Sequence, residues 1–182
     1  MKSLNTRYLV YITIVGAISY LSAKITKFPV FPSAPFLKMD AGEVPLTIFT
    51  LVGGVKFGLI ALLVKELLSL TVSGSNPFGL LADFLACGSF LTACWLIYKD
   101  RTSFRIITFV TMVVIATLTR LLVVVPVNLL VLRLQFGTCP KEVMKMMVWI
   151  LPFNGIKAIF TALCAYLLLP KLQKSLSKYF AG

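Results

Sequence analysis

The sequence predicts an all-α integral membrane protein, a bundle of six transmembrane helices with a long loop between the first two. Hydrophobic residues make up 59% of the 182 residues, and the mean hydropathy is +0.95. A soluble domain is roughly half apolar. The apolar residues here also form long continuous runs, and a membrane-spanning helix needs about 20 of them. The whole chain, 1–182, is therefore expected to form a single membrane domain.

The first apolar run follows a charged start, so it is either a signal peptide or a retained helix. The run is long for a signal peptide and no clear cleavage site precedes a soluble domain, which favours a helix over about residues 8–23. Four prolines between Pro29 and Pro45 then exclude a regular helix. They predict a loop of about 20 residues, a length that is uncommon without a function.

The later apolar runs are separated by short turns. "GGVKFG" and "SGSNPFG" flank the third run, and the basic stretch "KDRTSFR" precedes the fifth. Pro126 allows a kink or break in the fifth helix, and Pro140 can begin a short amphipathic segment before the sixth. The six predicted transmembrane helices cover about residues 8–23, 43–52, 59–72, 78–98, 106–134 and 147–169.

The net charge of +12 would suggest a nucleic-acid partner for a soluble protein. Here it indicates topology, because lysine and arginine collect in cytoplasmic loops, and no basic soluble face is available for nucleic acid. Six spans put both termini on one side, and the basic residues are more numerous on that side. The sequence therefore predicts cytoplasmic termini and an extracellular long loop.

Metal and catalytic sites are not expected. The chain has no histidine, which excludes Ser-His triads and zinc sites built on histidine. None of the cysteines forms a CxxC pair, and small buried thiols that pack well are the simplest interpretation. The four cysteines are Cys87, Cys94, Cys139 and Cys164.

Several polar side chains lie inside the apolar runs. Asn154 and Lys157 are three residues apart and share one helical face. Asn128 and Asp83 are expected at the same depth, near the outer ends of their helices and close to the long loop. Apolar walls with a few placed polar groups are typical of a small-molecule pocket. An asparagine amide both donates and accepts, so it matches the imide edge of a heterocycle, and a lysine can donate to a carbonyl.

The other charges have structural interpretations. Lys65 can extend toward the membrane surface, and Glu66 can pair with Lys157 or Arg120. Asp40 and Glu43 stand where an N-cap and a first-turn acid favour the helix dipole.

Three stretches resemble a known family. "FLKMDAGEVPLTIFTLVGGVKFGLIALLVKELL" resembles the first loop and the second and third helices of the substrate-binding S components of energy-coupling factor (ECF) transporters, the riboflavin-specific ones above all. "SGSNPFGLLADFLACGSFLTACWLIYK" resembles their fourth helix, and "LPFNGIKAIF" resembles the signature of their sixth. The resemblance covers nearly the whole chain. Arg120 stands where this family often has an asparagine, and Asp83 where an asparagine is common.

The resemblance implies a subunit of a bacterial plasma-membrane importer that captures riboflavin from outside. Riboflavin would be the transported ligand and not a cofactor. No Walker A motif occurs, so ATP-driven uptake would need partners, namely a transmembrane coupling protein and two cytoplasmic ATPase subunits. By the resemblance, Asn154 and Lys157 would bond the ring, and the ligand-binding residues would be Lys38, Met39, Asp40, Asp83, Asn128, Asn154 and Lys157.

The resemblance also implies a docking surface of small residues on the first helix, which let helices approach closely. The candidates are Thr13, Ala17, Ser19 and Ala23, for which lipid contact or packing within the chain is the alternative. Other functions also stay open: an S component for thiamine or folate, a membrane enzyme, or a structural protein without a ligand. The structural alternative predicts that Asn154 and Lys157 merely pair with Glu66 or Arg120.

Overall fold

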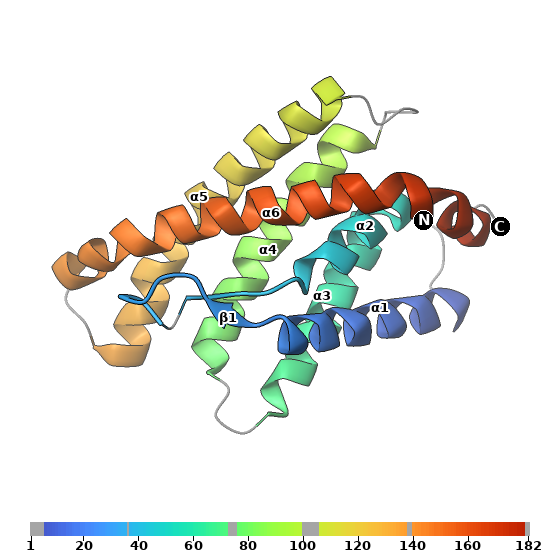
Figure 1. The fold of residues 1–182 in the computed structure, drawn as a ribbon. Coiled ribbons are helices and arrows are strands. Elements are labelled where there is room, and N and C mark those ends of the chain that lie inside the picture. The colour runs from blue at the N-terminus through green and yellow to red at the C-terminus, as the bar shows by residue number, and fades with distance from the viewer. Residues whose placement is uncertain (1–5, 36, 73–75, 100–105, 138–139, 181–182) are drawn as a thin grey trace.

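The prediction of an all-helical chain is confirmed. The computed structural model of the protein describes residues 6–35, 37–72, 76–99, 106–137 and 140–180, and Cys139 lies outside them. These residues form one two-stranded sheet, β1 (Phe28–Pro29) with β2 (Lys38–Met39), and six helices (Figure 1), which are α1 (Thr6–Ile25), α2 (Glu43–Gly53), α3 (Val55–Leu70), α4 (Pro77–Tyr98), α5 (Ile106–Phe136) and α6 (Pro140–Phe180).

Four stretches of the described chain are long and apolar enough to cross a membrane: Thr6–Ile25, Pro77–Tyr98, Ile106–Gln135 and Lys141–Leu172. Helix α2 has 11 residues, which give a length of about 16 Å, against about 30 Å for the hydrocarbon core of a bilayer. Helix α3 has 16 residues and carries two buried charges. The number of six membrane crossings therefore stays a prediction.

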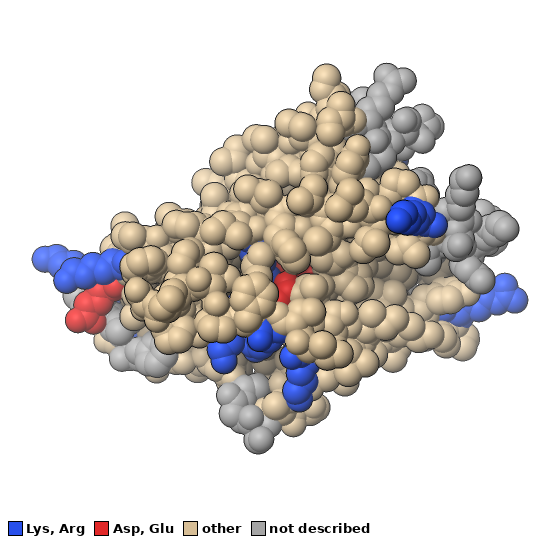
Figure 2. All heavy atoms as spheres, viewed as in Figure 1, with Lys and Arg blue, Asp and Glu red and all other residues tan. Residues whose placement is uncertain are grey.

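The surface of the described helices is largely apolar. Many leucine, isoleucine and valine side chains are more than one-third exposed, for example Ile107 at 74% and Leu122 at 75%. Figure 2 shows that lysine and arginine atoms lie mainly at the ends of this face and beside a recess near its middle, in which acidic atoms are visible. An apolar exterior of this extent indicates a membrane protein.

The short helix α2 is the centre of the bundle. It contacts α1, α3, α4 and α6, and eight of its 11 residues are buried. Gly54 caps its C-terminus, with a φ of 107° that is open to glycine and strained for other residues. This turn separates α2 from α3, and at the other end of α2 Glu43 is fully buried.

Helix α1 approaches α3 closely at Gly16. A Cβ atom added there would lie 2.7 Å from Val64 Cγ1 and 3.0 Å from the carbonyl oxygen of Ala61. Any larger side chain would have to push the two helices apart. The glycine therefore permits this helix contact.

The segment 26–42 leads from α1 to α2 and contains the antiparallel β1–β2 pair, with Phe28 opposite Met39. The ring centroids of Phe31 and of Trp149 on α6 lie 5.5 Å apart. Immediately after β2, Asp40 is buried. The segment thus places a carboxylate beside the N-terminus of α2.

Helix α6 is longer than the sequence predicts, because it begins at Pro140 and not near residue 147. Lys141 and Lys145 are exposed while Val143 and Met147 are buried. This amphipathic turn therefore continues the same helix and is no separate segment. Helices α5 and α6 also continue through their internal prolines, and the rings of Pro126, Pro152 and Pro170 are exposed.

Candidate functional site

A group of charged and amide side chains lies inside the bundle at the N-terminus of α2. Its members come from segment 26–42 and from helices α2 to α6, and hydrogen bonds or ion pairs connect them. We call this group the polar cluster; it consists of Asp40, Glu43, Lys65, Glu66, Asp83, Arg120, Asn154 and Lys157.

Glu43 is the centre of the polar cluster, and its side chain is fully buried. The guanidinium of Arg120 donates from Nη1 to Glu43 Oε2 at 2.5 Å and from Nη2 to Oε1 at 3.0 Å. Such a two-bond fork fixes geometry as well as charge. Thr47 donates from its hydroxyl to the Glu43 carbonyl oxygen at 2.8 Å, one turn further along α2.

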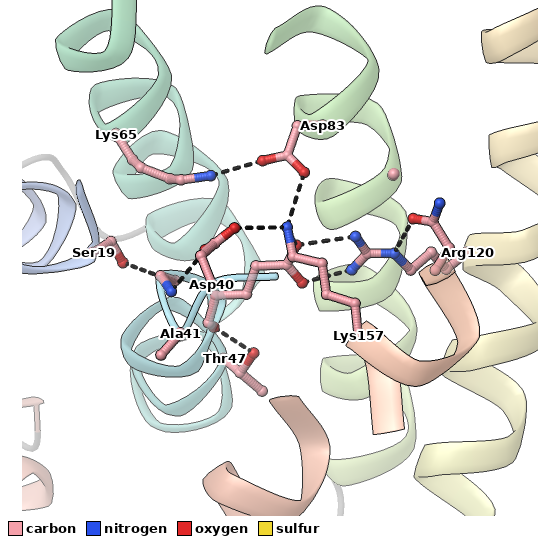
Figure 3. Close-up of polar contacts among 12 residues, drawn as sticks. Ser19, Asp40, Ala41, Thr47, Lys65, Asp83, Arg120 and Lys157 are labelled. Atoms are coloured by element: carbon pink, nitrogen blue, oxygen red, sulfur yellow. Dashed lines mark hydrogen bonds and ion pairs between the residues drawn. The ribbon is translucent and has the colours of Figure 1, made fainter. Parts of the chain in front are cut away.

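Lys157 on α6 joins three carboxylates (Figure 3). Its Nζ lies 2.7 Å from Glu43 Oε1, 3.2 Å from Asp40 Oδ2 and 3.3 Å from Asp83 Oδ1. The contact with Asp83 has the geometry of a hydrogen bond, and those with Glu43 and Asp40 are ion pairs. The cost of burying this cation is thereby offset by opposite charges.

Lys65 on α3 extends the cluster toward α4. Its Nζ lies 2.8 Å from Asp83 Oδ2 and 2.7 Å from Glu66 Oε1. The prediction that Lys65 extends to the membrane surface is wrong, because the residue is only 4% exposed. The pairing of Glu66 with Lys157 or Arg120 is wrong as well, because Lys65 is its partner. The second oxygen of Glu66, Oε2, is buried without a hydrogen-bond partner among the described residues.

Asn154 connects the cluster to the body of α6. Its Oδ1 accepts from Arg120 Nε at 3.0 Å, and its Nδ2 donates to the Ile150 carbonyl oxygen at 3.0 Å. This pairing with Arg120 is one that the structural alternative predicts. The amide still has one donor and one acceptor position that these two bonds do not use.

Four of the predicted ligand-binding residues come together in the cluster: Asp40, Asp83, Asn154 and Lys157. Met39 is buried and Lys38 is exposed on β2, next to Asp40 in the chain. Asn128 is half-buried and donates to the Val124 carbonyl oxygen of its own helix at 2.9 Å. Within the described contacts it does not join the cluster.

The predicted docking residues of α1 fall into two groups. Thr13 is exposed and Ala17 is half-buried. Ser19 is buried and donates to the Gly42 carbonyl oxygen at 2.7 Å, and Ala23 lies against Gly42 closely enough to exclude a Cβ atom there. Ser19 and Ala23 therefore serve packing within the chain, which is the alternative that the sequence left open.

Sequence reasoning missed the central roles of Glu43 and Arg120. It interpreted Glu43 as a first-turn acid, which it is, and Asp40 as an N-cap. In the structure the N-cap is Gly42, and Asp40 Oδ1 accepts from the Gly42 backbone N–H at 2.9 Å. One signal could have found this pair, because charges inside a membrane normally pair with one another. Using it would have meant matching Arg120 to an acid far away in the sequence.

The cluster can bind polar groups but offers little chemistry. Four carboxylates face three cations, and they neutralise one another instead of activating a nucleophile. Among the described residues, no group of three or more histidine, cysteine, aspartate or glutamate side chains is placed to hold a metal ion. Such a site suits recognition of a ligand through hydrogen bonds.

Comparison with known proteins identifies the class. The profile of the family described as "ECF transporter, substrate-specific component" matches residues 7–169. A solved structure of the S component of a bacterial ECF transporter superposes with a TM-score of 0.79 at 33% identity, covering 94% of this chain and 98% of that one. The chain therefore belongs to the family of ECF transporter substrate-specific components, which are membrane transport proteins and not enzymes.

Two relatives of this chain are riboflavin transporters. The riboflavin transporter RibU of Staphylococcus aureus (strain TCH60) is 32% identical over 181 residues, 96% of this chain and 94% of that protein. RibU of Streptococcus thermophilus (strain ATCC BAA-250 / LMG 18311) is 36% identical over 105 residues, 54% of this chain and 48% of that protein. The resemblance seen in the sequence is thus confirmed at the level of the family.

Proposed function

We propose that this chain captures riboflavin for import. The observation that carries the proposal is the similarity to the S. aureus riboflavin transporter, which extends over nearly the full length of both chains. The polar cluster supports it, because a buried amide and a buried ammonium suit a neutral heterocycle with carbonyl and N–H groups.

In this proposal Asn154 and Lys157 bond the polar edge of the riboflavin ring. Asn154 has one donor and one acceptor position beyond its contacts with Arg120 and Ile150. Lys157 lies among three carboxylates, and a ligand carbonyl that accepts from its Nζ would take the place of one of these contacts. The contacts to Asp40 and Asp83, at 3.2 and 3.3 Å, are longer than the contact to Glu43 and are the ones to yield.

Segment 26–42 is proposed to cover the ligand from the extracellular side. Lys38, Met39 and Asp40 then lie over the bound molecule, and Asn128 joins the site only if the ligand extends toward it. The exchange of Asp40 for a ligand carbonyl would link binding to a rearrangement of this segment. The Phe31–Trp149 contact supports a segment that is closed over α6 in this structure.

The transport context is also proposed. The chain resides in the bacterial plasma membrane with cytoplasmic termini and docks on a coupling protein with two ATPase subunits. Figure 1 supports a common side for the termini, because the first residues of α1 and the last of α6 lie at the same end of the molecule. Thr13, which is exposed, and Ala17, which is half-buried, are the proposed docking residues.

The test is a titration of riboflavin with the protein purified in mild detergent. We expect stoichiometric quenching of flavin fluorescence, and a flavin absorption spectrum if the vitamin copurifies. Asn154→Ala and Lys157→Ala should each raise the Kd by about 5- to 150-fold, the equivalent of about 1–3 kcal/mol per lost bond. Asn128→Ala removes the same amide outside the polar cluster and should raise the Kd less.

A protein that leaves riboflavin fluorescence unchanged would contradict the proposal. Titrations with thiamine and folate then separate the remaining possibilities. Binding of either vitamin would keep the transport role with a different ligand. Loss of thermal stability in Asn154→Ala and Lys157→Ala, without binding of any of the three vitamins, would favour the structural role.

A further inference from the structure

Arg120 lies deep in the bundle, and its contact with Asn154 allows only one orientation of the Asn154 amide. A guanidinium has only donors and keeps its charge at any physiological pH. The group of Asn154 that lies 3.0 Å from Arg120 Nε must therefore be the carbonyl oxygen, because a reversed amide would place two donors against each other. The Ile150 carbonyl, which accepts from Nδ2 at 3.0 Å, enforces the same orientation from the other side.

The guanidinium itself cannot turn to follow a rotating amide. Both of its terminal nitrogens bond Glu43, it is 1% exposed, and it lies over the ring of Phe90 at 5.9 Å from the ring centre. Side chains from α2, α4 and α5 thus combine to hold one amide on α6. This is more restraint than the stability of a single hydrogen bond requires.

We propose that Arg120 is a positioning residue that fixes the Asn154 amide and thereby sets the selectivity of the site for the donor and acceptor pattern of its ligand. The inference rests on the proposed function. With the amide fixed, its free N–H and its free oxygen lone pair have set positions. A ligand edge that presents a carbonyl beside an N–H matches them, and an edge whose N–H is blocked leaves the second lone pair of the Asn154 oxygen, the one not used by Arg120, without a donor.

The test compares riboflavin with N3-methylriboflavin, which lacks the imide proton. The measured quantity is the ratio of the Kd of the methylated compound to the Kd of riboflavin. A general loosening of the fold weakens both ligands alike and leaves this ratio unchanged, whereas loss of amide orientation lowers it. The variant is Arg120→Lys, which keeps a cation for Glu43 but loses the rigid fork and the Nε donor.

For the unaltered chain we expect a ratio of at least about tenfold, the usual discrimination for one buried hydrogen bond. In Arg120→Lys the Kd of riboflavin should rise about tenfold while the methylated compound changes by less than about threefold. Thr47→Ala is the matched control, because it removes a buried hydrogen bond to the backbone of Glu43 without a contact to Asn154. Its ratio should equal that of the unaltered chain.

A second measurement tests whether Arg120 acts through Asn154 and not directly on the ligand. In the Asn154→Ala background the further change Arg120→Gln should leave the ratio unchanged, whereas Arg120→Gln alone should lower it. An equal weakening of both ligands in the Arg120 variants overturns the inference and leaves the proposed function intact. An unaltered chain that does not bind riboflavin overturns the proposed function, and the inference with it.

Discussion

The buried pair of Glu43 and Arg120 gives the sharpest test of how the polar cluster contributes to stability. We consider three variants: Glu43→Met, Arg120→Met and the double variant. Removing one partner of a buried ion pair leaves the other charge unpaired, at a cost of about 3–5 kcal/mol. Arg120→Met should lie at the low end of this range, because Glu43 keeps Lys157 at 2.7 Å.

The double variant should be much less destabilised than the sum of the single variants. Replacing a whole buried pair by apolar side chains of similar volume is often close to neutral. What remains is the loss of one contact of Lys157 with Glu43 and one of Asn154 with Arg120, at about 1 kcal/mol each. We therefore expect a total of about 1–3 kcal/mol, and a coupling energy between the two sites of at least about 3 kcal/mol.

The assay is thermal unfolding in detergent, followed with a fluorogenic maleimide. The thiols of Cys87 and Cys94 are free and buried, so they react when the bundle opens. At roughly 2–4 °C per kcal/mol for a chain of this size, each single variant should lower the Tm by about 6–20 °C. The double variant should melt above both. Glu142→Met, an exposed acid on α6, is the control and should shift the Tm little.

A double variant whose shift in Tm equals the sum of the two single shifts would refute this reasoning. It would mean that Glu43 and Arg120 stabilise the fold independently. The fork between them would then be a consequence of packing and not a source of stability.

Two further predictions use the same assay. Glu66→Gln should change the free energy of unfolding by less than about 1 kcal/mol. The reason is that the amide oxygen can still accept from Lys65, and the Oε2 that becomes an N–H group has no partner to lose among the described residues. Asp83→Asn weakens contacts with two lysines, and an equally large loss in Glu66→Gln would contradict this prediction. Gly16→Val should lower the free energy of unfolding by roughly 1–3 kcal/mol through overpacking against α3. Ile14→Val, on the exposed side of α1, is the control and should change it little. Equal Tm values for the two variants would refute close packing at Gly16.

The sequence was sufficient to predict the four long helices α1, α4, α5 and α6, because a run of apolar residues long enough to span a bilayer has few other structures open to it. The predicted start of α6 was wrong, because this argument does not apply to its charged first turns. The residues before 147 look like a loop because Lys141, Glu142 and Lys145 are charged. In the structure they form the exposed side of a helical turn, which a hydropathy pattern does not distinguish from a loop.

The sequence predicted the residues of the site better than the contacts between them. Asp83, Asn128, Asn154 and Lys157 could be grouped because each is a polar residue expected near the outer end of its helix, although Asn128 does not join the cluster within the described contacts. Asp40 was added to the site by the family resemblance. The fork between Glu43 and Arg120 joins residues 77 positions apart, and only the way in which α2 and α5 approach the same point decides it. The same reason explains why Glu66 pairs with its neighbour Lys65 and not with a cation on α5 or α6.

The composition of the polar cluster argues that its purpose lies beyond stability. Buried ion pairs can often be replaced by apolar residues without loss of stability, and an apolar core would also satisfy a helix bundle in a membrane. The chain instead holds four carboxylates and three cations around the N-terminus of α2, next to segment 26–42. What ionic contacts add is direction: they fix the carbonyl of Asn154 toward Arg120 and hold Lys157 among three carboxylates. In the proposed function this fixed amide and the buried ammonium beside it recognise a polar ring edge, which an apolar core could not do.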